Sequence, residues 1–154
     1  MNHLIGRLRG VTVDTDPFPH YYIEQVLPED YYEQLLKHLP GSSVYENLYE
    51  VTDLKLDHFR HRYQRDLNEG WTNALPLALQ NFWNSFNEWF LSAQLAEAFL
   101  ESFTEPLRPR IGEREAWPEV SVEAQFIRHR AGYFLGPHSD LYTKLVVVLV
   151  YLAP

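Results

Sequence analysis

The sequence predicts an α+β fold in which N-terminal helices pack against a mainly antiparallel sheet. Apolar residues recur at helical spacing through much of the chain, whereas its last part contains alternating and then continuous apolar runs. We expect helices near residues 28–39, 74–91 and 93–103, and strands within 121–130 and 144–152. A chain of 154 residues has a one-domain length, so we expect a single domain over residues 1–154.

Local signals mark the ends of the predicted helices. Pro28 suits a first helical turn, and Glu29 and Asp30 favour the positive end of the helix dipole. The pair Pro40-Gly41 stops this helix, and Ser92 can cap the helix that begins near residue 93. Aromatic and aliphatic side chains at helical spacing between these signals are expected to form the core.

The remaining segments carry weaker patterns. Residues 20–26 alternate weakly and are expected to form a strand, and residues 10–13 are compatible with a short one. Val51, Leu54 and Leu56 are candidates for a further strand. Residues 104–118 hold three prolines and mixed charge, which predicts a connection with room for a short strand near Arg110.

Composition limits the classes of partner. The formal charge of −8 argues against a nucleic-acid backbone as the main partner. The sequence has no cysteine, which is compatible with a reducing cytoplasm. The first residues lack the apolar core of a signal peptide, and the longest apolar run, 145–153, is far shorter than a membrane span. We therefore expect a cytoplasmic protein that binds neither nucleic acid nor membrane.

The stretch from Gln125 to Pro154 carries the main candidate for chemistry. His138 and Asp140 follow a Gly-Pro corner and precede a nearly continuous β-branched run. A histidine and an aspartate one residue apart at a strand end can direct an imidazole and a carboxylate at one cation. That pair is two thirds of the facial triad that holds non-haem Fe(II). The alternative is a surface turn between two core strands, whose His and Asp are merely solvated.

The block G-Y-F-L-G-P-H-S-D-L-Y-T-K-L-V-V-V-L-V-Y-L-A-P resembles the start of the double-stranded β-helix of 2-oxoglutarate/Fe(II)-dependent oxygenases. It is most similar to the prolyl-hydroxylase-like bacterial members, with Gly132 six residues before His138. The phrase from Pro17 to Pro28 also looks like the opening of these proteins. The resemblance implies a partial double-stranded β-helix (jelly-roll) and a hydroxylase-type dioxygenase acting on a peptide side chain or a small molecule. It implies His138 and Asp140 as metal ligands, with Fe(II) and 2-oxoglutarate as cofactor and co-substrate.

The sequence departs from the family pattern in several places. Many relatives carry a tyrosine where this chain has His129, and hydroxylase relatives often carry another where it has Leu135. The family also has a second histidine as third ligand, and beyond it a basic residue for the far carboxylate of 2-oxoglutarate. Here no histidine follows His138 and no arginine follows Arg130.

Three histidines within the chain are candidates for the third ligand: His58, His61 and His129. None of them stands at the family position. His58 and His61 lie among several arginines, whose charge would oppose a metal cation, so we expect a surface or substrate-lid role for this pair. Lys144 could meet an anion, although a solvent-facing lysine at a strand edge is the plainer interpretation.

The number of strands sets a further expectation. A complete jelly-roll needs about eight strands, whereas residues from Glu119 onward leave room for about three. We therefore expect the N-terminal portion of an oxygenase, inactive by itself; the alternative is a non-catalytic module that oligomerises through its strands. A metal-dependent hydrolase using the same His138 and Asp140 is a third interpretation. The uncovered run Lys144–Leu152 predicts a homo-oligomer.

Overall fold

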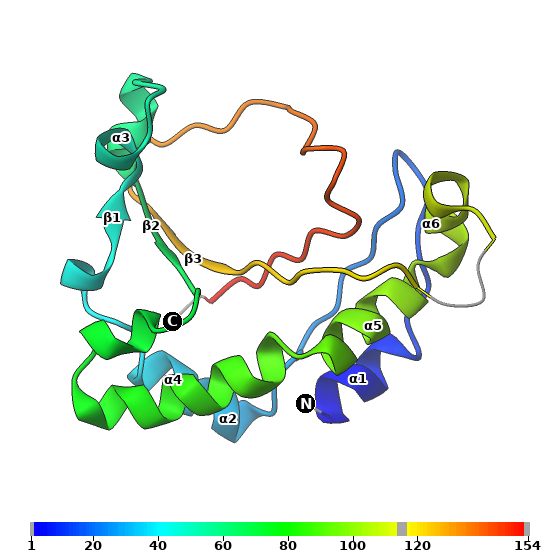
Figure 1. Ribbon diagram of the computed structural model, residues 1–154, viewed down its shortest axis with the longest axis horizontal. Coiled ribbons are helices and arrows are strands. Elements are labelled where there is room, and N and C mark those ends of the chain that lie inside the picture. Colours follow the sequence, from blue (N-terminus) through cyan, green and yellow to red (C-terminus); the bar gives the residue numbers. More distant parts are fainter. Residues whose placement is uncertain (1, 114–116, 153–154) are drawn as a thin grey trace. The chain divides into compact units, whose positions relative to one another are not determined.

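The computed structural model describes residues 2–113 and 117–152 (Figure 1). Within this part of the chain, helices accompany a three-stranded antiparallel sheet, so the predicted α+β class is confirmed. The chain forms two compact units. Unit 1 comprises Met1–His38, Glu88–Val122 and Leu141–Pro154, and unit 2 comprises Leu39–Asn87 and Glu123–Asp140. The expectation of one oxygenase-like domain over residues 1–154 stays a prediction.

Unit 1 is built mainly from helices. In the described residues these are α1 (Asn2–Leu8), α2 (Glu29–Lys37), α5 (Ala93–Ser102) and α6 (Thr104–Ile111), with the last turn of α4. The predictions for residues 28–39 and 93–103 are thereby confirmed. Helix α1 was not predicted, because a helix of this length is held by tertiary packing rather than by local signals.

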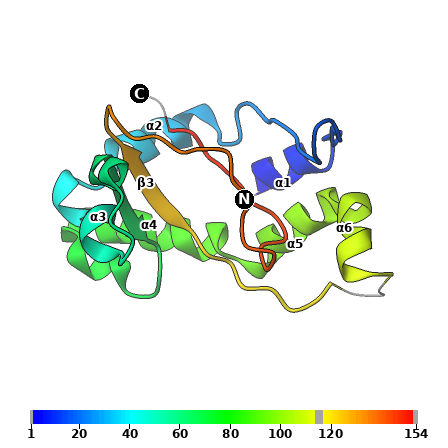
Figure 2. The ribbon, with the colours of Figure 1, turned by 90° about the horizontal axis from the view of Figure 1, so that it is seen from above.

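The core of unit 1 forms where α1 lies alongside α5 (Figure 1 and Figure 2). Leu4, Ile5 and Leu8 share one face of α1 and pack against Leu95 of α5, and all four are buried. The hydroxyl of Ser92 accepts a hydrogen bond from the backbone N–H of Leu95 at 3.2 Å, so the predicted cap is present. This cap fixes the start of α5 three residues before the buried Leu95.

Helix α6 replaces the connection and the short strand predicted for residues 104–118, over the part of that range that the structure describes. The negative and positive side chains of Glu105 and Arg108 form an ion pair at 2.7 Å, one turn apart. Leu107 is buried, and Gly112 ends the helix with a positive φ of 75°. Two of the three prolines, Pro106 and Pro109, therefore lie within a short packed helix rather than in an extended connection.

Unit 2 combines a small sheet with helix α4 (Leu77–Phe90), which matches the helix predicted for residues 74–91. The strands are β1 (Glu46–Asn47), β2 (Arg62–Asp66) and β3 (Gln125–His129), in the spatial order β1-β2-β3. β3 confirms the strand predicted within residues 121–130. Short helices complete the unit: α3 (Leu48–Val51) and 3-10 helices at Ser42–Val44, Asp57–His61 and Trp71–Ala74.

An aromatic core joins α4 to the sheet of unit 2. Trp83 of α4 is fully buried, and its ring meets the ring of Phe126 on β3 edge-on, with centroids 4.7 Å apart. Trp71 is 1% exposed and contacts both of these rings at 5.7 Å. Because alternate residues of a strand face opposite ways, Phe126 lies on the face of β3 that contacts this core, and Ile127 and His129 lie on the opposite face.

The other predicted strands are wrong. Residues 20–26 form no strand; His20 makes an isolated bridge with Asp14, and residues 10–13 form none either. Residues 51–56 enclose the end of α3 and a turn, with Val51, Leu54 and Leu56 exposed. The strand that unit 2 contains in this part of the sequence is β2, in the charged stretch Arg62–Asp66.

Residues 144–152 also form no strand, although their composition is typical of one. A β-strand needs a neighbouring strand to satisfy its backbone groups, and in the described residues no strand pairs with this segment. One side chain holds the start of this segment instead: Arg110 donates hydrogen bonds to the carbonyls of Tyr142, just before it, and of Lys144, its first residue. β-branched composition alone is therefore insufficient for a strand here.

Candidate functional site

His138 and Asp140 lie in an irregular, exposed segment rather than at the predicted strand end. The backbone carbonyl of Gly136 lies 3.0 Å from Nδ1 of His138. Because a carbonyl can only accept, Nδ1 carries the proton and donates it, which leaves the lone pair on Nε2 available to a cation. The histidine thus has the tautomer and backbone support that metal-binding histidines commonly show.

The described residues do not complete a metal site around this pair. Nowhere in residues 2–113 and 117–152 do three or more histidine, aspartate or glutamate side chains gather closely enough to hold a metal ion. His138 and Asp140 therefore fit Fe(II) by donor type but do not reach the number of protein ligands that a facial triad needs. The three histidines considered as third ligands belong to a different arrangement.

That arrangement lies at one end of the β2–β3 pair. We call it the sheet-end cluster and define it as His58, His61, Arg62, His129 and Tyr133. Arg62 stands directly opposite His129 in the antiparallel ladder. The imidazole of His129 stacks on the ring of Tyr133, with centroids 4.0 Å apart and planes 15° apart. Nη1 of Arg62 donates a hydrogen bond to the hydroxyl of Tyr133 at 3.2 Å.

The other two histidines hold the loop that follows β3. His58 meets the Tyr133 ring edge-on at 6.0 Å. His61 lies so close to Gly132 that a Cβ built there would be 2.9 Å from Nε2 of the imidazole. Gly132 also has a φ of 97°, which L side chains rarely adopt. Glycine is therefore required at this position for both space and backbone conformation.

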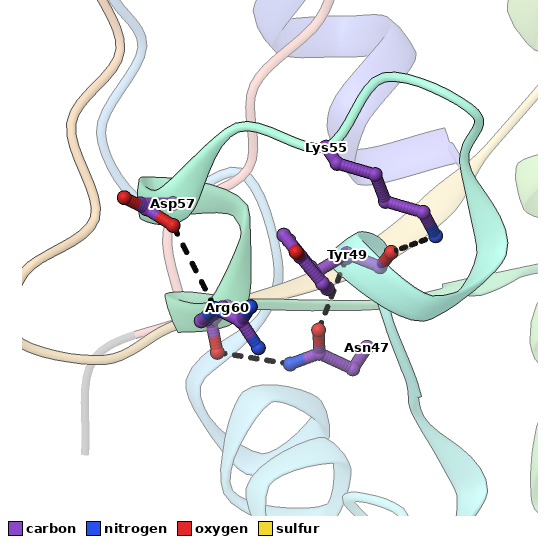
Figure 3. A network of polar contacts seen from close by, with 5 residues as sticks. All are labelled: Asn47, Tyr49, Lys55, Asp57 and Arg60. Carbon is purple, nitrogen blue, oxygen red and sulfur yellow. Dashed lines mark hydrogen bonds and ion pairs between the residues drawn. The ribbon is translucent and has the colours of Figure 1, made fainter.

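A polar network fixes the segment that carries His58 and His61 (Figure 3). The side-chain amide of Asn47 donates to the carbonyl of Arg60 at 2.9 Å and accepts from the backbone N–H of Tyr49 at 3.0 Å. The Arg60 guanidinium stacks 3.6 Å above the Tyr49 ring and pairs with Asp57 at 3.9 Å. Lys55 donates to the carbonyl of Tyr49. The 3-10 helix Asp57–His61 is thus tied to β1 and α3 within unit 2.

The pKa of His129 lies below its ordinary value. The main cause is desolvation, because the Tyr133 ring covers one face of an imidazole that is otherwise exposed; the positive charge of Arg62 acts in the same direction. At neutral pH the imidazole is accordingly neutral and offers one N–H donor. The Arg62–His129 pair is therefore positively charged through Arg62 rather than through His129.

This lowered pKa predicts a pH dependence of stability. Between the folded and unfolded pKa values the unfolded chain binds more protons, so the free energy of unfolding rises with pH. The contribution of His129 is complete above its unfolded pKa, near 6.5, and is lost as the pH falls below it. We expect His129→Gln to reduce the loss of thermal stability on acidification from about pH 7 to about pH 5, measured by circular dichroism.

Tyr133→Ala provides the matched test of the cause, because it removes the ring that desolvates the imidazole. We expect this variant to reduce the same pH dependence. A His129→Gln variant with the wild-type difference in Tm between the two pH values would contradict the assignment. The Tm of each variant at about pH 5 is compared with its own Tm at about pH 7, so a change in stability that is the same at both pH values does not affect the result.

A surface hollow of about 550 Å³ lies in unit 1 and contains none of the predicted site residues. Its lining includes the apolar side chains of Val11 and Ile23 as well as Arg7, whose Nη2 donates to the carbonyl of Glu24 at 2.9 Å. Within the described residues no helix is long and apolar enough to cross a membrane.

The sequence identified His138 and Asp140 by motif but gave no sign of the sheet-end cluster as a unit. Arg62 and Tyr133 were not predicted as site residues, because their contact depends on the β2–β3 register. The only feature of the sequence that indicated this cluster was the group of two histidines and two arginines within residues 58–62.

Comparisons with protein-family models, curated proteins and solved structures find no match to this chain.

Proposed function

We propose that this chain forms part of an Fe(II)- and 2-oxoglutarate-dependent dioxygenase of the hydroxylase type, with His138 and Asp140 as iron ligands. The observation that carries the proposal is the block from Gly132 to Asp140, with its glycine six residues before the histidine and its H-x-D spacing. When bound, the iron with 2-oxoglutarate and O2 supplies the oxidation that hydroxylates a peptide side chain or a small molecule. The proposal also includes a partial double-stranded β-helix that contains β3. It places the protein in the cytoplasm, with which the lack of cysteine is compatible.

The hydrogen bond from His138 to Gly136 supports the role of this histidine, since it presents Nε2 to a cation. The chain's own contribution is to hold the metal through one neutral imidazole and one carboxylate. A third protein ligand is not placed beside them within the described residues. Two ligands leave most of the coordination sphere to water, so the metal affinity of the chain by itself should be low.

Anaerobic calorimetric titration with Fe(II), or with Mn(II) in its place, tests this proposal. We expect a dissociation constant weaker than about 1 μM, which corresponds to about −8 kcal/mol, and no measurable binding by His138→Ala. His20→Ala is the matched control, because Nδ1 of His20 also donates to the carbonyl two residues before it, at 2.8 Å. This control should bind like the wild type.

Two outcomes would change the interpretation. Submicromolar binding that survives His138→Ala would reject the site. Submicromolar binding that His138→Ala abolishes would keep the site but contradict the expected weakness, and would mean that a third ligand from this chain or a second copy reaches the metal.

A second candidate function is that of a non-catalytic module that oligomerises through the apolar segment within residues 144–152. The observation that favours it is the exposed apolar run Val147–Tyr151, whose side chains are 40% to 78% exposed. Monomeric proteins rarely expose contiguous apolar patches of this kind unless they serve binding. This candidate requires self-association without metal, whereas the oxygenase proposal requires metal binding through His138.

A further inference from the structure

Arg62 in the sheet-end cluster carries a charge that the described residues do not compensate. Its side chain is partly buried, and its Nε is inaccessible to solvent and has no hydrogen-bond partner. No carboxylate of residues 2–113 and 117–152 forms an ion pair with it. Buried charges in proteins are normally paired, because taking an unpaired ion out of water costs several kcal/mol.

Two neighbouring arginines pair with carboxylates, whereas Arg130 stacks over the Tyr63 ring at 4.6 Å. Arg60 pairs with Asp57 and stacks 3.6 Å from the Tyr49 ring, and Arg65 pairs with Glu46 at 3.9 Å. Arg62 has no carboxylate partner among the described residues, and its guanidinium lies 5.9 Å from the centroid of the Tyr133 ring, at the limit where cation–π attraction is significant.

Two hydrogen-bond donors belong to the residues beside this charge. The hydroxyl of Tyr133 accepts from Nη1 of Arg62, which leaves its own proton to donate, and the described residues give it no acceptor. The neutral imidazole of His129 stacks on the same tyrosine ring and carries one N–H donor. A cation with two further donors and no carboxylate is a group that favours a negatively charged oxygen ligand.

We propose that the sheet-end cluster binds an oxyanion, the carboxylate or phosphate group of a ligand, through Arg62 with Tyr133 and His129 as additional donors. Arg62 supplies the charge, and the loop that follows β3 supplies the tyrosine hydroxyl. The close approach of Gly132 to His61 fixes that loop over the end of the strands. The site does not depend on iron, so it stands apart from the proposed dioxygenase function.

The test is an NMR titration of the ¹⁵N-labelled chain with inorganic phosphate and, separately, with acetate. The buffer is freed of metal by a chelating resin and kept at constant ionic strength, because exposed charges respond to salt. We expect concentration-dependent shifts of the backbone amides near Arg62, His129 and Tyr133. Shifts with phosphate only assign a phosphate-bearing ligand, shifts with acetate only assign a carboxylate, and shifts with both support the shared oxyanion chemistry.

Arg62→Gln should weaken binding at least about tenfold. Arg128→Gln is the matched control, because it removes one positive charge from β3 at a side chain that donates to the hydroxyl of Ser42 at 2.7 Å. It should change affinity by no more than about twofold, as expected for a screened surface charge. Equal losses in the two variants would indicate attraction by overall charge and would overturn the site.

Tyr133→Phe decides the question if Arg62→Gln fails to fold, since it removes the hydroxyl and keeps the ring that stacks on His129. We expect it to lower affinity about threefold or more, the effect of losing one hydrogen bond. Unchanged affinity in this variant would overturn the site, since the Tyr133 hydroxyl is the group that Arg62 contacts there. The absence of site-specific shifts with either anion would overturn it as well.

Discussion

Replacing Trp83 by alanine should lower the free energy of unfolding of unit 2 by about 3–5 kcal/mol. The side chain is fully buried, and its ring contacts Phe126 of β3 and Trp71 as well as two phenylalanines of its own helix, Phe82 and Phe86. Alanine would leave a cavity between the helix and the sheet. Surrounding side chains fill such cavities only in part, so the loss exceeds the transfer free energy of the ring.

Urea denaturation followed by far-UV circular dichroism measures this effect. Leu77→Ala is the matched control on the same helix, because Leu77 is 74% exposed and should change the free energy by no more than about 0.5 kcal/mol. A loss below about 1 kcal/mol for Trp83→Ala would place Trp83 outside the core.

Local signals account for the helices that could be predicted. Ser92 accepts the hydrogen bond expected of a cap, and Glu29 and Asp30 stand in the first turn of α2. These features act within a few residues, so one segment of sequence is enough to reveal them. α1 and α6 depend instead on burial of Leu4 and Leu107, and burial is set by residues elsewhere in the chain.

Strands were predicted less well, because a strand is defined by its neighbour. β2 lies in a polar, charged stretch without apolar alternation, and it exists because it pairs with β3 from a distant part of the sequence. Residues 144–152 have the opposite property: their composition favours a strand, yet no strand in the described part of the chain pairs with them. Pairing thus overrides β-propensity in both directions.

The same distinction applies to the candidate sites. One residue separates His138 from Asp140, so a motif was sufficient to single them out. The sheet-end cluster joins Arg62 to His129 through the register of the ladder, and adds Tyr133 through a loop that Gly132 allows to fold back. Those contacts depend on tertiary structure, and residue spacing does not encode them.

The exposed apolar run Val147–Tyr151 predicts that this chain self-associates, and Val148→Lys should weaken that association at least about tenfold. Val148 is 43% exposed within this run, and its neighbours are exposed as well. Covering apolar surface is worth roughly 25 cal/mol per Å², and an unpaired β-branched segment can also gain backbone hydrogen bonds from a second copy. A two-fold dimer satisfies both copies in one contact.

Size-exclusion chromatography with light scattering should give twice the 18.2 kDa chain mass for the wild type at micromolar concentration. Val148→Lys should give the monomer mass or precipitate, because a lysine ammonium in the contact would have to leave water without an acidic partner. Leu77→Lys adds the same charge at an exposed leucine of α4 and should remain a dimer. A monodisperse wild-type monomer would refute self-association, and a soluble Val148→Lys dimer would place the contact on another surface.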